Sequence, residues 1–109
     1  MARTVLMAMA FALLATAARG QEVISCRGNI TSIQGEGLVH RTYRFEVSEV
    51  KGIDLATVLE RCRELARDRQ NKAARQNPGG SFRKMSDVNL DCVRGTEKFD
   101  VRRTIQTSP

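Results

Sequence analysis

The sequence predicts an α+β domain, a small two-layer sandwich in which one helix packs on one face of a four-stranded antiparallel sheet. Apolar residues recur at helical spacing over residues 54–76. Two stretches before this helix and two after it alternate apolar and polar residues, as half-buried strands do. Two hairpins joined through a helix most simply form one antiparallel sheet with the helix across one face, in ββαββ order.

The helix over residues 54–76 is the best-defined element. Asp54 is the predicted N-cap, because its carboxylate can accept hydrogen bonds from the free amides of the first turn. Ile53 and Val58 fall at the two positions of a hydrophobic staple. The sequence NPGG at residues 77–80 ends the helix, since the residue before a proline avoids helical geometry. The stripe expected to face the core consists of Leu55, Val58, Leu59, Cys62, Leu65 and Ala66.

The four strands are predicted from their alternation. The first strand follows Gln21 and places Ile24, Cys26, Gly28 and Ile30 on one face. The second, residues 38–50, places Val39, Tyr43, Phe45 and Val47 on one face and His40 on the other. After the helix, the third strand buries Val88, Leu90 and Cys92, and the fourth buries Phe99, Val101 and Ile105. The order of the strands in the sheet is left open.

Residues 1–20 are predicted to be a signal peptide, and residues 21–109 the single domain. A basic residue, Arg3, precedes a short alanine-rich apolar run, and small residues support cleavage before Gln21. Cleavage before Ala18 or Arg19 is an alternative, as is a lipobox ending at Cys26. No later apolar segment approaches twenty residues, so no membrane span is expected after removal of the leader. The composition of the leader favours a bacterial source and a periplasmic or secreted protein.

Three cysteines in an exported chain predict one disulfide and one unpaired thiol. Cys62 faces inward on the helix and Cys92 faces inward on the third strand, so the preferred bridge is Cys62–Cys92. Cys26 is then the odd thiol. The rival pairing, Cys26–Cys92, requires the first and third strands to be neighbours.

Catalytic chemistry finds little support in the sequence. His40 is the only histidine, and a general base there needs a partner such as Glu46. There is no nucleophile motif, no glycine-rich phosphate loop and no zinc-ligand spacing. Asp87 and Asp91 share a strand face that could attract a cation, but they lack the glycine turn of a calcium loop. We therefore predict no catalytic residue, no metal and no cofactor.

The best candidate for a binding surface is the basic C-terminal half of the helix. The residues singled out are Arg67, Arg69, Lys72 and Arg75. Arginine forks suit phosphates and carboxylates, which favours an acidic protein or an anionic envelope polymer as partner. Nucleic acid is not expected, because the domain is poor in aromatic residues for base stacking. A solvated helix face without a ligand is the alternative.

These observations favour a small exported, non-catalytic binding module of the cell envelope that recognises an anionic macromolecule. The alternatives are a small hydrolase that uses His40 and a structural envelope protein without a ligand. The oligomeric state is left open.

The intact mass of the exported protein tests the predicted leader. We expect the mass of residues 21–109. This product has a formal charge of +4, because cleavage removes Arg3 and Arg19 from a chain of formal charge +6. A mass that includes residues 1–20, or a diacylglycerol adduct on Cys26, would contradict this processing.

Overall fold

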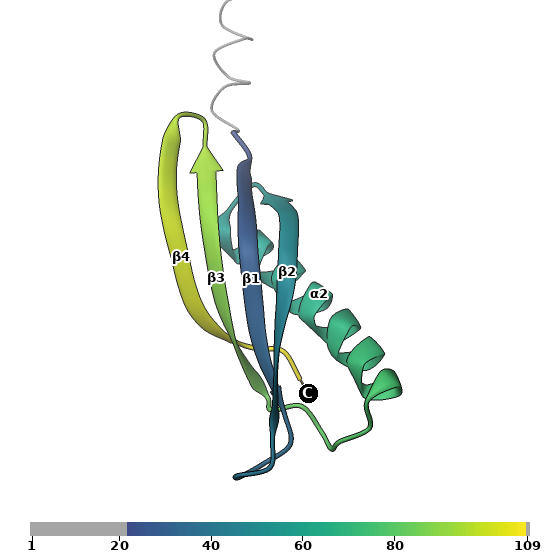
Figure 1. Ribbon diagram of the computed structural model, residues 1–109. Helices are drawn as coiled ribbons and strands as arrows, with labels where there is room; N and C mark the ends of the chain where they lie inside the picture. The colour runs from purple at the N-terminus through teal and green to yellow at the C-terminus, as the bar shows by residue number, and fades with distance from the viewer. Residues whose placement is uncertain (1–21, 109) are drawn as a thin grey trace, which may run out of the picture.

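The computed structural model describes residues 22–108 and confirms the predicted fold class. The elements follow in ββαββ order (Figure 1). They are β1 (Ile24–Gln34), β2 (Arg41–Gly52), α2 (Leu55–Gln76), β3 (Met85–Arg94) and β4 (Glu97–Gln106). The predicted leader and its cleavage site lie outside the described residues.

The strands form one antiparallel sheet in the order β2-β1-β3-β4. Each hairpin, β1–β2 and β3–β4, pairs neighbours in sequence, and the β1–β3 pairing joins the two hairpins. Helix α2 starts beside the end of β2 and runs back along one face of the sheet (Figure 1). The sheet therefore has one face covered by the helix and one open face.

The core lies between α2 and the covered face, and the predicted alternation accounts for it. Val58, Cys62 and Ala66 of the helix stripe are completely buried, while Leu55, Leu59 and Leu65 pack around them. The strands contribute Ile24, Cys26, Ile30, Val47, Val50, Val88, Leu90, Cys92 and Val101. Phe99 and Ile105 of β4 are half-buried against this cluster, as their inward positions predict.

A bulge and a close approach shape the centre of the sheet. The β1–β2 register shifts between Cys26 and Gly28, where two residues of β2, Ser48 and Glu49, lie opposite one residue of β1. A side chain at Gly28 would collide with the carbonyl oxygen of Asn89 on β3. Glycine is therefore required at this position, where the backbones of β1 and β3 approach closely.

The ends of α2 were predicted correctly except for the staple. The Asp54 carboxylate accepts a hydrogen bond from the Thr57 amide at 2.7 Å, and hydrogen bonding to the Thr57 side chain and amide lowers the pKa of Asp54. The helix ends at Gln76, and the Asn77 amide donates to the Ala73 carbonyl. Ile53 is 71% exposed, so it does not pack on the buried Val58. The predicted hydrophobic staple is wrong.

The second strand begins at Arg41, three residues later than predicted. Gly35 and Gly37 adopt positive φ angles of 90° and 67°, and the last β1–β2 pair is Gln34 with Arg41. Residues 35–40 are therefore a loop, and Leu38 and Val39 are 101% and 87% exposed. The prediction that Val39 faces the core is wrong.

A buried polar cluster fastens the C-terminal half of α2 to the sheet. Its members come from four elements: Gln70 of α2, Ser32 of β1, Ser86 of β3, and Thr107 after β4. The Gln70 amide nitrogen lies 3.1 Å from both the Ser32 and the Thr107 hydroxyl oxygens. Ser86 links the two hydroxyls at 2.8 and 2.6 Å. These hydrogen bonds satisfy polar side chains that are at most 5% exposed.

The disulfide joins Cys26 to Cys92, so the predicted Cys62–Cys92 bridge is wrong. Because β1 and β3 are neighbours, the two cysteines lie directly opposite one another with Cα atoms 4.1 Å apart. Cys62 does face the core, as predicted, but it is a free and fully buried thiol. The rival pairing was the correct one.

We expect the double substitution Cys26→Ala/Cys92→Ala to lower the free energy of unfolding by about 4 kcal/mol. The bridge spans a sequence separation of 66, and a loop of that length is worth this much in the chain-entropy model. Denaturant unfolding measures the loss. The single substitution Cys62→Ala is the control, because it removes a cysteine and leaves the bridge. Equal sensitivity of both variants to a reducing agent would refute the assignment.

Candidate functional site

Charge is unevenly distributed along the length of the molecule. We divide the described chain into two ends by a plane across the sheet between Asn29 and Ile30, and we continue the division through α2 between Ala66 and Arg67, since Gln70 already contacts Ser32. The hairpin end (residues 30–45, 67–88 and 103–108) carries nine basic and three acidic side chains, a net charge of +6. The disulfide end (residues 22–29, 46–66 and 89–102) carries seven basic and nine acidic side chains, a net charge of −2. A domain of modest net charge thus has one strongly basic end.

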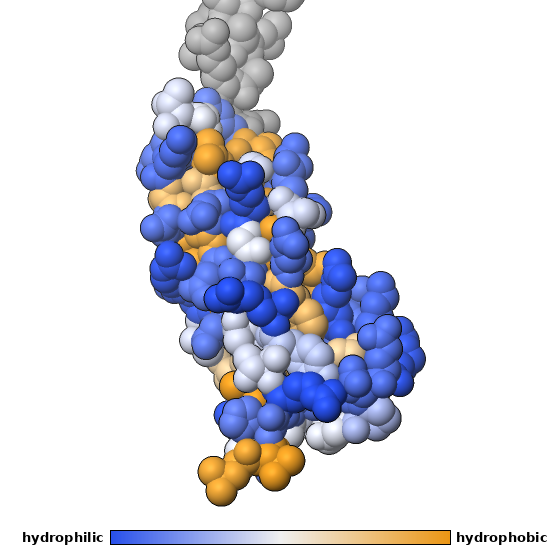
Figure 2. Space-filling view, viewed as in Figure 1, coloured by the Kyte–Doolittle hydropathy of each residue, from blue (hydrophilic) through white to orange (hydrophobic). Residues whose placement is uncertain are grey.

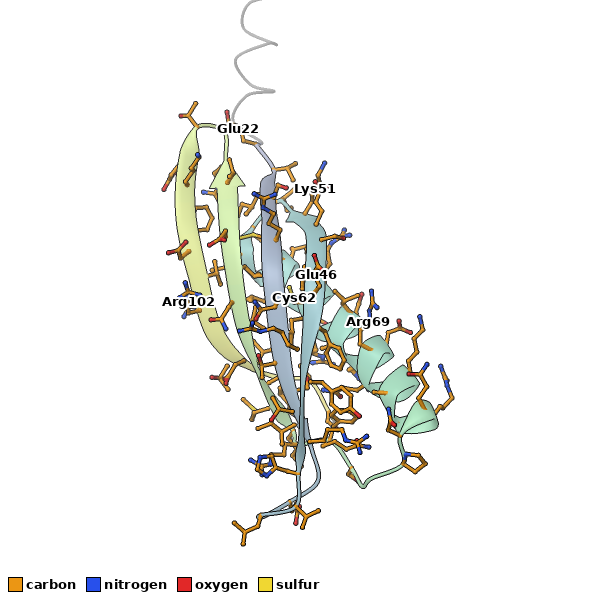
Figure 3. All side chains as sticks on the ribbon, in the orientation of Figure 1. Glu22, Glu46, Lys51, Cys62, Arg69 and Arg102 are labelled. Carbon is orange, nitrogen blue, oxygen red and sulfur yellow. A yellow bond between two sulfur atoms is a disulfide. The ribbon has the colours of Figure 1, made fainter. Side chains whose placement is uncertain are left out.

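The four predicted binding residues all lie at the hairpin end and are all exposed. They do not form one flat patch. At about 100° per residue, Arg67 and Arg69 point about 200° apart around the helix axis. Arg69 faces β2 and lines a shallow depression with Glu46 (Figure 3). The Lys72 Nζ lies 3.9 Å from the Asp68 Oδ2. The four cations surround the end of α2 rather than converge on one ligand.

The basic residues that the strands bring to the same end were not predicted as part of the binding surface. These are Arg41, Arg44, Arg83, Lys84 and Arg103. They come from β2, the α2–β3 connection and β4, and the sheet register places them at the same end of the molecule as the helix cations. Counting charge along the strands in a known register would have found them.

The loop between β1 and β2 forms an apolar tip at this basic end. Leu38 and Val39 project into solvent, and Figure 2 shows the apolar cluster at the extremity of the molecule. Residues 81–83 hold the base of the loop. The Gly35 amide donates to the Ser81 carbonyl at 2.9 Å, and the Arg83 side chain donates to the Gly35 carbonyl at 3.3 Å. The loop is thus exposed at its tip and fixed at its base.

Aromatic residues reinforce this base without offering a stacking surface. The Tyr43 ring lies 5.5 Å from the Phe82 ring and 5.8 Å from the Phe45 ring. The Tyr43 hydroxyl donates to the Gln34 side chain at 3.3 Å. All three rings are half-buried. Exposed aromatic platforms of the kind that stack nucleobases are not found among residues 22–108.

His40 lies in the exposed loop rather than on the β2 face that was predicted. Its Nδ1 is 3.0 Å from the Gly37 carbonyl oxygen. Glu46 is six residues further along, about 20 Å away at the rise of an extended chain. The histidine and its proposed carboxylate partner are therefore not brought together.

The carboxylates singled out in the sequence are dispersed as well. Asp87 accepts a hydrogen bond from the Thr104 hydroxyl at 2.9 Å, and Asp91 lies opposite Arg27 in the sheet. Within residues 22–108, no three histidine, cysteine, aspartate or glutamate side chains gather as metal ligands. The described part of the chain also holds no helix long and apolar enough to span a membrane.

The open face of the sheet is polar and offers no extended apolar surface. Its central residues are Arg27, Asn29, Glu46, Asn89, Asp91, Asp100 and Arg102. A shallow depression at the disulfide end of this face combines Arg27 and Lys98 with Glu49, Asp91 and Asp100. Because these opposite charges nearly cancel, the depression does not select an anion.

The fold is that of a small α+β domain with a disulfide across its two central strands. No family model matches the chain, and neither a curated protein nor a solved structure is significantly similar to it. The site is therefore defined by geometry and charge: a basic end that carries an apolar tip.

Cys62 is the remaining group with reactive chemistry, and its environment keeps it inert. The thiol is completely buried in the core. Burial disfavours the thiolate and raises the pKa of Cys62 from 9.0 to about 11. A protonated, inaccessible thiol is a poor nucleophile, so Cys62 is a core residue.

This raised pKa predicts a loss of stability at alkaline pH. Above pH 9 the Cys62 thiol ionises in the unfolded chain but stays protonated in the folded protein. This ionisation stabilises the unfolded state relative to the folded state. The free energy of unfolding should fall as pH rises from about 9 to about 11, by at most about 1.4 kcal/mol per pH unit from this group. Denaturant unfolding of the protein and of Cys62→Ala over this range measures the difference. Parallel pH profiles would show that Cys62 contributes nothing.

Proposed function

We propose that the protein is a small exported, non-catalytic binding module that captures an anionic macromolecule through its hairpin end. The observation that carries the proposal is the separation of charge between a hairpin end of +6 and a disulfide end of −2. Such a molecule is oriented by the field of an anionic surface before contact, which increases the fraction of productive encounters.

The disulfide supports export, because such bridges persist in oxidising compartments such as the periplasm and the extracellular space. In those compartments the anionic macromolecules include envelope polymers, acidic proteins and membrane surfaces. Nucleic acid is a weaker candidate, since the aromatic residues of the hairpin end are half-buried.

The distribution of cations around the end of α2 suits a broad anionic surface better than a small ligand. A pocket for one phosphate or carboxylate needs several donors aimed at one point. Arg67 and Arg69 point in different directions, and the cations of the strands lie beyond them. The module is therefore expected to respond to the density of negative charge rather than to one chemical group.

A hydrolase that uses His40 is disfavoured, because among residues 22–108 this side chain forms no ion pair with a carboxylate and its Nδ1 lies 3.0 Å from the Gly37 carbonyl oxygen of its own loop. A structural envelope protein without a ligand is the remaining alternative. This alternative predicts that binding to a polyanion does not depend on which end of the molecule loses its basic residues.

Neutralising the helix cations should weaken binding to an immobilised polyanion. In the variant Arg67→Gln/Arg69→Gln/Lys72→Gln/Arg75→Gln, glutamine retains good helix propensity while four charges are removed. We expect elution from heparin at a distinctly lower salt concentration, because fewer counterions are displaced on binding.

The matched control is Arg27→Gln/Lys51→Gln/Arg94→Gln/Lys98→Gln, which removes four exposed charges from the disulfide end. Both variants have the same net charge, so a difference between them reports position. Equal elution of the two variants would contradict the proposal. Turnover of a substrate that His40→Ala abolishes would establish the hydrolase instead.

A further inference from the structure

We propose that the anionic partner is the surface of a lipid bilayer, and that the tip of the β1–β2 loop inserts its two apolar side chains among the lipids. This inference rests on the proposed function and names its partner. It begins from Leu38 and Val39, which are 101% and 87% exposed. Folding leaves both side chains in water, so only a partner can bury them.

Basic residues are placed to accompany the insertion. Arg41 follows Val39 by two residues, and Arg83 is held against the loop by its hydrogen bond to the Gly35 carbonyl. Lys84 is the next residue along the chain. An apolar tip with cations immediately behind it matches the layers of an anionic bilayer, where acyl chains lie beneath negatively charged headgroups.

The orientation of the charge along the molecule favours a tip-first approach. The tip lies at the basic hairpin end, whereas Glu22 lies at the opposite, acidic end (Figure 3). An anionic surface attracts the first end and repels the second.

The shape of the tip favours a bilayer over a protein or a soluble polymer. A stable protein interface covers roughly 800 Å² on each partner, much more than two projecting side chains provide. A soluble polyanion would engage the cations and leave Leu38 and Val39 in water. A bilayer accommodates both the cations and the apolar side chains without a preformed groove.

The backbone of the loop limits the depth of insertion. Gly35 has its amide paired with Ser81, but residues 36–39 have no such backbone bonds to residues 81–83. Unpaired amide and carbonyl groups are not tolerated in hydrocarbon, so the loop must stop at the headgroup–acyl boundary. Binding is therefore peripheral and reversible, and it should weaken as salt is raised.

A single tryptophan provides a direct test, since the chain contains none. In Leu38→Trp the reporter replaces a side chain that is fully exposed, so the fold is retained. The exported protein is mixed with vesicles of phosphatidylcholine and phosphatidylglycerol. We expect a blue shift of the tryptophan emission and quenching by brominated acyl chains. Ile53→Trp, at a 71% exposed position of the disulfide end, is the matched control and should show neither.

Binding by co-sedimentation completes the test. Leu38→Ser/Val39→Ser should bind these vesicles roughly tenfold or more weakly, because it removes the apolar part of the contact. Ile53→Ser/Val23→Ser, which changes exposed apolar residues elsewhere, should bind as the unchanged protein does. Heparin binding should be unaffected in both variants.

The outcomes separate this inference from the proposed function. Retention on heparin without vesicle binding, or vesicle binding that the tip variant retains in full, would overturn the lipid inference and leave an anionic polymer or acidic protein as partner. Failure to bind heparin and vesicles alike would overturn the proposed function as well. Equal affinity for pure phosphatidylcholine vesicles would overturn the anionic bilayer as partner, because the charge of the headgroups would then play no part.

Discussion

The pairing of β1 with β3 is the contact on which the rest of the structure depends. Without it the chain would consist of two separate hairpins, and an isolated two-stranded hairpin is at best marginally stable in water. The pairing joins residues 56 to 70 positions apart, so it must overcome a substantial loop-closure entropy. Two features of these strands favour it: Gly28 permits the close approach to Asn89, and Cys26 lies directly opposite Cys92.

The basic end inherits its geometry from this pairing. Once β1 and β3 are neighbours, Ser32 and Ser86 lie side by side on the covered face. Their hydroxyl oxygens accept hydrogen bonds from the side-chain amide of Gln70 on the helix. A buried amide that needs these partners disfavours other rotations of α2 about its axis. The polar cluster therefore fixes the direction in which Arg69 and the other helix cations point. The same pairing brings residues 81–83 to the base of the apolar loop.

Local patterns predicted most of the fold, and long-range pairings accounted for most of the errors. The apolar stripe of α2 and the alternation of β1, β3 and β4 could be predicted because each depends only on the spacing of residues within one helix or strand. The facing of Cys62 and Cys92 was also correct, but facing does not decide which thiols meet. That depended on the strand order, which no periodicity encodes.

Leu38 and Val39 resembled a strand because apolar residues adjoined an alternating segment. Gln70 and Ser32 were unexpected in the core, since their burial is favourable only when both are present. The helix part of the basic end was predicted; the part contributed by strands required their register.

The buried free thiol of Cys62 has a consequence for oxidative folding of the chain. Three cysteines permit three different single bridges, and only Cys26–Cys92 agrees with the folded sheet. Helix α2 is local in sequence, whereas β1 and β3 meet only after a long loop has closed. A chain oxidised before that closure can trap Cys62 in a bridge that must be exchanged before the core can form. The yield of oxidative folding is therefore set by the order of two events, sheet closure and thiol oxidation. For the exported module proposed above, a thiol–disulfide isomerase should therefore raise the yield of native protein more than a stronger oxidant would.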